Sequence, residues 1–91
     1  MKRNVGTTTR QIKSLPIGAI FIWCNNDIRY PTNLAVSIGR NDLEIVGVSF
    51  LDNLKFLGRE FTGFDVDHAT EINENRLKAM GIIRTRIRAK R

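Results

Sequence analysis

The sequence predicts a small α/β fold in which short helices cover both faces of a parallel sheet. The sheet is expected to have three strands, with a fourth strand as an alternative. Strand-like and helix-like segments alternate along the chain, which is typical of parallel strands joined by helical crossovers. The first strand-like segment is apolar on both of its alternating faces, so both faces need cover. The chain has 91 residues, which is enough for one domain.

The expected elements follow one another without a linker or repeat. Helices are expected at residues 7–16, 31–38, 50–57 and 74–80, and strands at 17–25, 42–50 and 60–67. With the most apolar strand in the centre, the expected spatial order is 2-1-3, a Rossmann-like or flavodoxin-like arrangement of three layers.

Three helix starts have capping residues in the sequence. Thr8 and Gln11 have the spacing of a capping box, and Ser49 and Asn73 are further candidate N-caps. Each places a side-chain oxygen where it can accept a hydrogen bond from the first turn of the helix.

Four residues are expected to end the helices. Pro16 cannot continue the first helix. Gly39, Gly58 and Gly81 can adopt the left-handed conformation that terminates the other three.

The third strand alternates more clearly than the first. Phe64 and Val66 face one way, whereas Asp65 and Asp67 face the other. A half-polar strand is typical of a sheet edge, and an exposed edge can also pair with a second copy of the chain.

Positive charge is concentrated at the C-terminus. Residues 1–75 carry eight Lys/Arg and nine Asp/Glu, whereas residues 76–91 carry seven Lys/Arg and no acid. We therefore divide the chain into a core domain at 1–81 and a basic C-terminal segment at 82–91. The segment fits a strand, with four cations on one face, or an extension of the last helix, and both alternatives stay open.

Composition argues against several classes of protein. No apolar run approaches the roughly 20 residues that a membrane span requires, and the N-terminal residues lack the apolar stretch of a secretory signal. Cys24 is the single cysteine, so no disulfide can form within the chain, and we expect a reducing, cytoplasmic location. We also expect no contact with a membrane.

A first candidate site lies where the third strand ends. Asp65 and Asp67 share one strand face, and His68 follows directly. Parallel sheets place ligand sites at this end, and two carboxylates can hold Mg²⁺. The alternative is a solvated Asp65 with Asp67 capping the following turn. We expect no cofactor, with Mg²⁺ as the one candidate.

The segment EFTGFDVDHATEI, residues 60–72, together with the lead at residues 57–61, resembles the Walker B strand of RecA-like P-loop ATPases, in which an apolar strand ends in Asp-Glu-Ala. The resemblance covers residues 43–80. The resemblance implies that Asp67 would help to hold Mg²⁺, and Ala69 also matches, but His68 replaces the glutamate that orients the attacking water. No G-x-x-x-x-G-K-[ST] phosphate loop occurs in the chain. The resemblance therefore implies a degenerate fragment without hydrolytic competence.

A second candidate site follows the first strand. Asn25, Asn26, Asp27 and Arg29 form a polar cluster that is expected beside Asp67. Arg29 could contact an anion, whereas the alternative is an ordinary Asn/Asp turn. Cys24 is expected to be a buried packing residue rather than a nucleophile.

The third candidate site is the basic C-terminal region, because Lys and Arg bind phosphate backbones by releasing counterions. No base-reading motif accompanies it. Its expected contact residues are Arg76, Lys78, Arg84, Arg86, Arg88, Lys90 and Arg91.

These features predict a non-enzymatic module that contacts nucleic acid, or a complex that processes it, through the basic segment. The chain also resembles the compact α/β accessory proteins of tailed phages in length and composition. Two other functions stay open: an inhibitor or adaptor that docks on a host enzyme, with an acidic protein surface as partner, and a degenerate nucleotide- or metal-binding fragment.

Overall fold

Every strand of the molecule is followed by a helix, and one further helix precedes the first strand. The structure is a computed structural model that describes residues 5–88. Its elements are α1 (Val5–Ser14), β1 (Ile20–Ile22), α2 (Arg29–Ser37), β2 (Glu44–Val46), α3 (Ser49–Asp52), β3 (Phe64–Val66) and α4 (Glu74–Arg84).

The three strands form one parallel sheet in the order β2-β1-β3, which confirms the predicted fold. Ile20 of β1 is in register with Glu44 of β2 on one side and with Phe64 of β3 on the other. All three residues of β1 are buried. The strand that is apolar on both faces therefore takes the centre, where both faces are covered.

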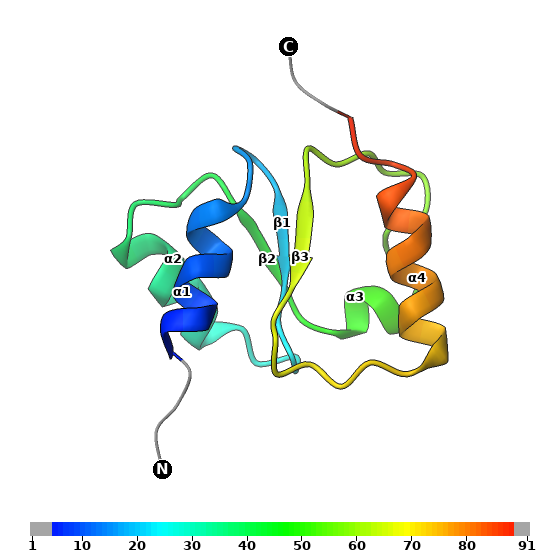
Figure 1. Cartoon of the computed structure of the whole chain (residues 1–91), viewed down its shortest axis with the longest axis horizontal. Coiled ribbons are helices and arrows are strands. Elements are labelled where there is room, and N and C mark those ends of the chain that lie inside the picture. Colours follow the sequence, from blue (N-terminus) through cyan, green and yellow to red (C-terminus); the bar gives the residue numbers. More distant parts are fainter. Residues whose placement is uncertain (1–4, 89–91) are drawn as a thin grey trace.

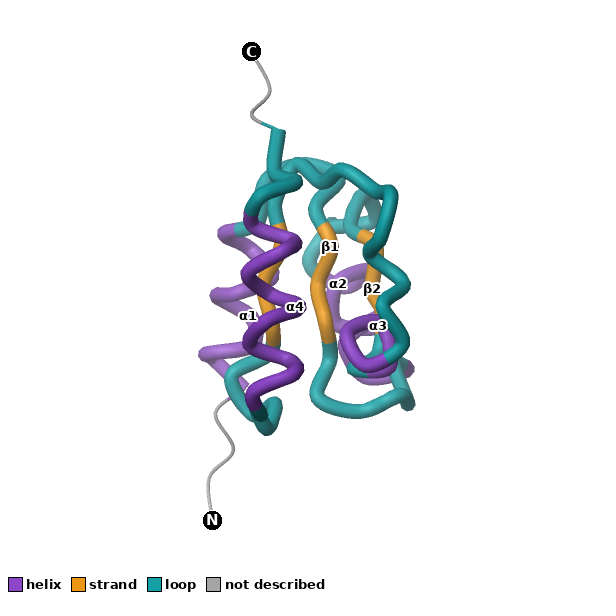
Figure 2. Tube along the Cα trace, turned by 90° about the vertical axis from the view of Figure 1, so that its right-hand side faces the viewer, coloured by secondary structure: helices purple, strands orange, loops and turns teal. Residues whose placement is uncertain are grey.

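Helices cover the sheet on both faces, α1 and α2 on one and α3 and α4 on the other (Figure 1). Figure 2 looks onto the sheet and shows β2 and β3 at its two edges. Ile20 and Ile22 of β1 pack into the core under α3 and α4, whereas Phe21 packs into the core under α1 and α2. Two thin cores thus share one central strand.

The parallel strands give the sheet a distinct amino end and carboxyl end. The segments after β1, β2 and β3 lie at the carboxyl end, at the bottom of Figure 1, and each helix returns the chain to the amino end. Residues 85–88 follow α4 and therefore lie at the amino end, at the top of the figure.

Two of the three predicted N-caps are wrong. α1 begins at Val5, so Thr8 and Gln11 lie inside the helix and bond to the region of β3 instead. The N-cap of α3 is Val48 rather than Ser49, and the Val48 side chain forms no capping hydrogen bond. Asn73 is confirmed as a cap, since its side-chain oxygen accepts the Arg76 backbone N–H at 2.8 Å.

Two helices end at places that the sequence analysis did not predict. α3 has four residues and gives way to turns, although Gly58 has the expected left-handed φ of 76°. Gly81 does not end α4, which continues to Arg84. Ile83 is fully buried, and packing of this residue outweighs the roughly 1 kcal/mol that a glycine costs inside a helix.

Within residues 82–88, the C-terminal segment first extends the last helix and then forms one β bridge, with no fourth strand among the described residues. Residues 82–84 extend α4, and Ile87 then forms an isolated parallel bridge with Phe61, just before β3. The Phe61 N–H donates to the Arg86 carbonyl at 3.0 Å, and the Arg88 N–H donates to the Phe61 carbonyl at 2.8 Å. Lys90 and Arg91 lie outside the described residues.

Candidate functional site

The polar face of β3 packs against α1 rather than facing solvent. Asp67 is 2% exposed, and its two carboxylate oxygens accept hydrogen bonds from the Thr8 hydroxyl and the Ala69 N–H, both at 3.0 Å. Asp65 accepts a bond from the Gln11 side-chain amide at 2.9 Å. Both carboxylates of the first candidate site therefore have partners within the chain.

Gln11 joins α1 to the end of β3 through both the nitrogen and the oxygen of its side-chain amide. The amide nitrogen donates to the Val66 carbonyl as well as to Asp65, each at 2.9 Å. The amide oxygen accepts the His68 backbone N–H at 3.1 Å and lies 3.3 Å from His68 Nδ1. This arrangement positions His68 as a neighbour of Asp67, with Nδ1 3.5 Å from the carboxylate.

Cys24 lies close enough to Asp67 for the two side chains to interact electrostatically, so the ends of β1 and β3 are adjacent as predicted. Burial, with a further contribution from the Asp67 charge, raises the pKa of the Cys24 thiol. Because the thiolate is the nucleophilic form, a raised pKa opposes a catalytic role for this cysteine. Cys24 packs instead against the core under α1 and α2.

The polar segment after β1 forms hydrogen bonds mainly with itself and with the start of α3. The Asn25 side chain accepts the Asp27 N–H at 2.9 Å, and Arg29 forms two bonds to Asp27 at 2.7 and 2.9 Å. The Asn26 side chain accepts the Ser49 N–H at 2.9 Å. Arg29, the first residue of α2, thus forms an exposed ion pair with a carboxylate of the preceding loop.

Within residues 5–88, no group of three or more His, Cys, Asp or Glu side chains is placed to hold a metal ion. The bonds described above occupy Asp65 and Asp67. At the carboxyl end of the sheet, these hydrogen bonds thus join α1 to the end of β3.

The charges of the described residues separate between the two ends of the sheet. The amino end, called the basic end below, carries six cations (Lys13, Arg40, Arg59, Arg84, Arg86 and Arg88) and three acids (Asp42, Glu44 and Glu60). The carboxyl end, called the acidic end, carries five acids (Asp27, Asp52, Asp67, Glu71 and Glu74) and two cations (Arg29 and Arg76). The two ends therefore have formal charges of +3 and −3.

Two of the predicted contact residues do not lie at the basic end. Arg76 forms a fork with Asp52, with both bonds at 2.9 Å, and a further bond to the Glu71 carbonyl at 2.6 Å. It ties the first turn of α4 to α3. Lys78 lines a hollow between these two helices.

Arg84 and Arg86 have no ion pair with a carboxylate of the described chain. The Arg84 guanidinium lies 5.8 Å from the ring centroid of Phe64, beside the sheet edge. Arg86 uses its backbone in the bridge to Phe61, and its side chain is exposed. These two arginines are the unneutralised charges at the end of α4.

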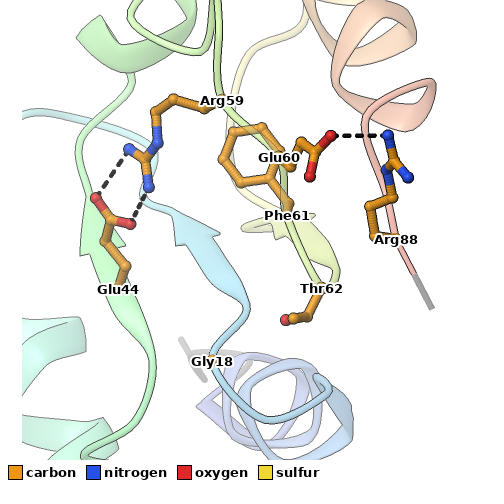
Figure 3. A pocket seen from close by; sticks show the side chains of 7 residues that line it. All are labelled: Gly18, Glu44, Arg59, Glu60, Phe61, Thr62 and Arg88. Carbon is orange, nitrogen blue, oxygen red and sulfur yellow. Dashed lines mark hydrogen bonds and ion pairs between the residues drawn. The ribbon is translucent and has the colours of Figure 1, made fainter. Parts of the chain in front are cut away.

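Arg88 and Arg59 flank a hollow of about 250 Å³ at the amino end of the sheet (Figure 3). Arg88 pairs with Glu60 at 2.9 Å, and both side chains are largely exposed. Arg59 forks onto Glu44 and lies over the rings of Phe50 and Phe61 at 5.6 and 5.2 Å. Arg59 is therefore positioned by a carboxylate and two rings, whereas Arg88 has only an exposed ion pair.

Arg40 and Arg59 belong to the basic end but were missed in the sequence analysis. Arg40 donates to the Ile12 and Pro16 carbonyls and forks onto Asp42, which brings it to the end of α1. Neither arginine lies directly beside another Lys or Arg in the sequence. The fold brings both to the amino end of the sheet, where Arg59 lines the same hollow as Arg88.

Comparison of the chain with protein-family models, with curated proteins and with solved structures finds no match. The likeness to Walker B strands therefore stays a prediction. None of the helices in the described part of the chain is long and apolar enough to cross a membrane.

Proposed function

We propose that the chain is a non-enzymatic binding module whose basic end contacts a polyanion, with nucleic acid as the partner. The proposal rests on one observation, the separation of +3 and −3 between the two ends of the sheet. A charge that served only solubility would be spread over the surface, whereas a one-sided field attracts a polyanion to one face.

The arrangement of the cations supports contact with a phosphate backbone rather than readout of bases. Arg84 and Arg86 are free of carboxylate partners, and Arg88 is held only by an exposed pair with Glu60. Exposed pairs contribute between about 0 and 1 kcal/mol, so a phosphate can replace the Glu60 carboxylate at little cost.

Fluorescence anisotropy with labelled single-stranded DNA, duplex DNA and RNA across a salt series tests the proposal. If three phosphates are neutralised, log K against log salt for the duplex falls with a slope of about −2.7. The double variant Arg84→Gln/Arg86→Gln is expected to reduce the slope by about 1.8.

The matched control is Arg10→Gln/Lys55→Gln, which removes the same charge at positions away from the basic end. It should leave the slope close to that of the unaltered chain. Equal losses in the two double variants, or binding that ignores salt, would contradict the proposal.

A further inference from the structure

The hollow at the basic end lies directly beside the C-terminal arginines, since Arg88 belongs to its lining. Two ion pairs stand on opposite sides of it (Figure 3): Arg59 with Glu44, and Arg88 with Glu60. Its volume is about 250 Å³. Sites for drug-sized ligands have volumes of roughly 300–1,000 Å³, so this hollow suits a smaller group such as a single nucleobase.

The two ion pairs beside the hollow differ in how strongly they are held. Arg59 forms two hydrogen bonds to Glu44, and its guanidinium also lies over two aromatic rings. Arg88 has only its 2.9 Å pair with Glu60, and the two side chains are 73% and 58% exposed. Because exposed pairs contribute little to stability, a phosphate that binds Arg88 separates it from Glu60.

Separation of this pair leaves the Glu60 carboxylate as a free acceptor at the hollow. An ionised carboxylate has two acceptor oxygens and no donor. Guanine presents two adjacent donors, N1–H and N2–H₂, on its Watson–Crick edge. Adenine and cytosine place a ring-nitrogen acceptor beside their amino group, and thymine and uracil flank one N–H with two carbonyls. The carboxylate therefore matches guanine better than any other base.

The opposite side of the hollow suits a planar ligand. The Arg59 guanidinium lies 5.2 Å from the centroid of the Phe61 ring, and the Arg59 side chain remains 39% exposed. Planar guanidinium groups stack on unpaired bases in single-stranded nucleic acid. Gly18 adds no side chain to the lining. These features favour a flat ring over a compact anion such as free phosphate.

We infer that the hollow binds one guanine base of a single-stranded nucleic acid, with Glu60 accepting from N1–H and N2–H₂ while Arg88 contacts a neighbouring phosphate. The assignment rests on the proposed function and specifies its substrate. A single strand is required, because base pairing occupies the same edge of guanine in a duplex. The arginines contact the backbone, and the carboxylate alone reads the base.

Fluorescence anisotropy with a labelled oligothymidine that carries one central guanine tests the inference against the same strand without it. The guanine strand should bind about fivefold more tightly, which corresponds to roughly 1 kcal/mol. Hypoxanthine at the same position lacks the N2 amino group and should lose part of this preference. Equal affinities with the salt dependence intact would overturn the guanine site and leave the proposed function in place. No binding of any strand would contradict both.

Two variants that remove the same charge locate the base contact. Glu60→Gln replaces one acceptor oxygen with an NH₂ group, so the preference for guanine should disappear, although loss of an acid should raise the affinity for every strand. Glu71→Gln, at the acidic end, should retain the preference. Both side chains are exposed, so both variants are expected to fold. A preference that persists in Glu60→Gln, or that both variants lose equally, would contradict the assignment.

Discussion

Both ends of the sheet contain charged side chains, but the two ends differ in which of these side chains have partners within the chain. At the acidic end, three of the five acids form a hydrogen bond or ion pair within the chain: Asp67 with Thr8, Asp52 with Arg76, and Asp27 with Arg29. At the basic end, Arg84 and Arg86 have no carboxylate partner among the described residues. A cluster of charged residues in a sequence is therefore a candidate ligand site only through those side chains that the fold leaves without a partner.

The largest effect is expected from a variant that breaks a hydrogen bond between α1 and β3 at the acidic end. Thr8→Val removes the hydroxyl donor to Asp67 and leaves a buried carboxylate oxygen without this partner. We expect a loss of about 2 kcal/mol in the free energy of unfolding, measured by urea denaturation. Thr9→Val, on the same helix at a partly exposed position, is the control. Equal stability of the two variants would show that the Thr8–Asp67 bond contributes little.

A second pair of variants distinguishes an arginine that stabilises the fold from one that has no carboxylate partner. Arg76→Ala loses the fork to Asp52 and the bond to the Glu71 carbonyl, and should reduce the free energy of unfolding by about 1.5 kcal/mol. Arg86→Ala should leave thermal stability unchanged but weaken binding to nucleic acid. If Arg76→Ala weakened binding at unchanged stability, the assignment of the two roles would be reversed.

The order of the strands could be predicted because it depends on local sequence. A central parallel strand must be apolar on both faces, and Phe21 and Ile22 show this in β1 without reference to any other segment. Asn73 was found as a cap for the same reason, since its partner is the backbone N–H of Arg76, three residues away.

The role of Thr8 and Gln11 could not be read in the same way. Two residues three positions apart fit a capping box at the start of a helix, but they also lie on one face inside a helix. Their partners, Asp67 and Asp65, lie 59 and 54 residues away. The polar face of β3 looked exposed because the sequence does not show which helix covers it.

A count of charged residues in each segment of the sequence also does not show which charges form pairs. Arg76 belongs to the basic C-terminal region of the sequence, yet its partner Asp52 lies 24 residues earlier. Arg40 and Arg59 lie in a part of the chain whose charges nearly cancel, yet they reach the basic end. The surplus of cations was predicted, whereas its location required the fold.

A third variant increases the difference in charge between the two ends of the sheet. Glu60→Gln removes one acid from the basic end and releases Arg88 from its exposed pair. Affinity for nucleic acid at low salt should rise by about threefold, roughly 0.6 kcal/mol, which anisotropy can detect. The control is Glu71→Gln at the acidic end, for which a smaller change is expected. No gain with Glu60→Gln would place Arg88 outside the contact.

The smallest expected effect concerns acid titration at the acidic end. Side-chain hydrogen bonds from Arg29 lower the pKa of Asp27 from 3.8 to about 2. A lowered pKa stabilises the fold at pH values above 3.8, and this contribution is lost as the pH falls through about 2. NMR titration of the carboxyl carbon should give this midpoint, and Arg29→Gln should raise it. An unshifted midpoint in the unaltered chain would show that the fork does not persist in solution.

The bridge between Ile87 and Phe61 has a consequence for how tightly the C-terminal arginines can bind a partner. Two backbone bonds already hold Arg86 and Arg88 against the sheet. A segment immobilised in advance gives up less conformational entropy on association than a free tail does. Loss of these two bonds should therefore make association with a partner less favourable while leaving the number of positive charges unchanged.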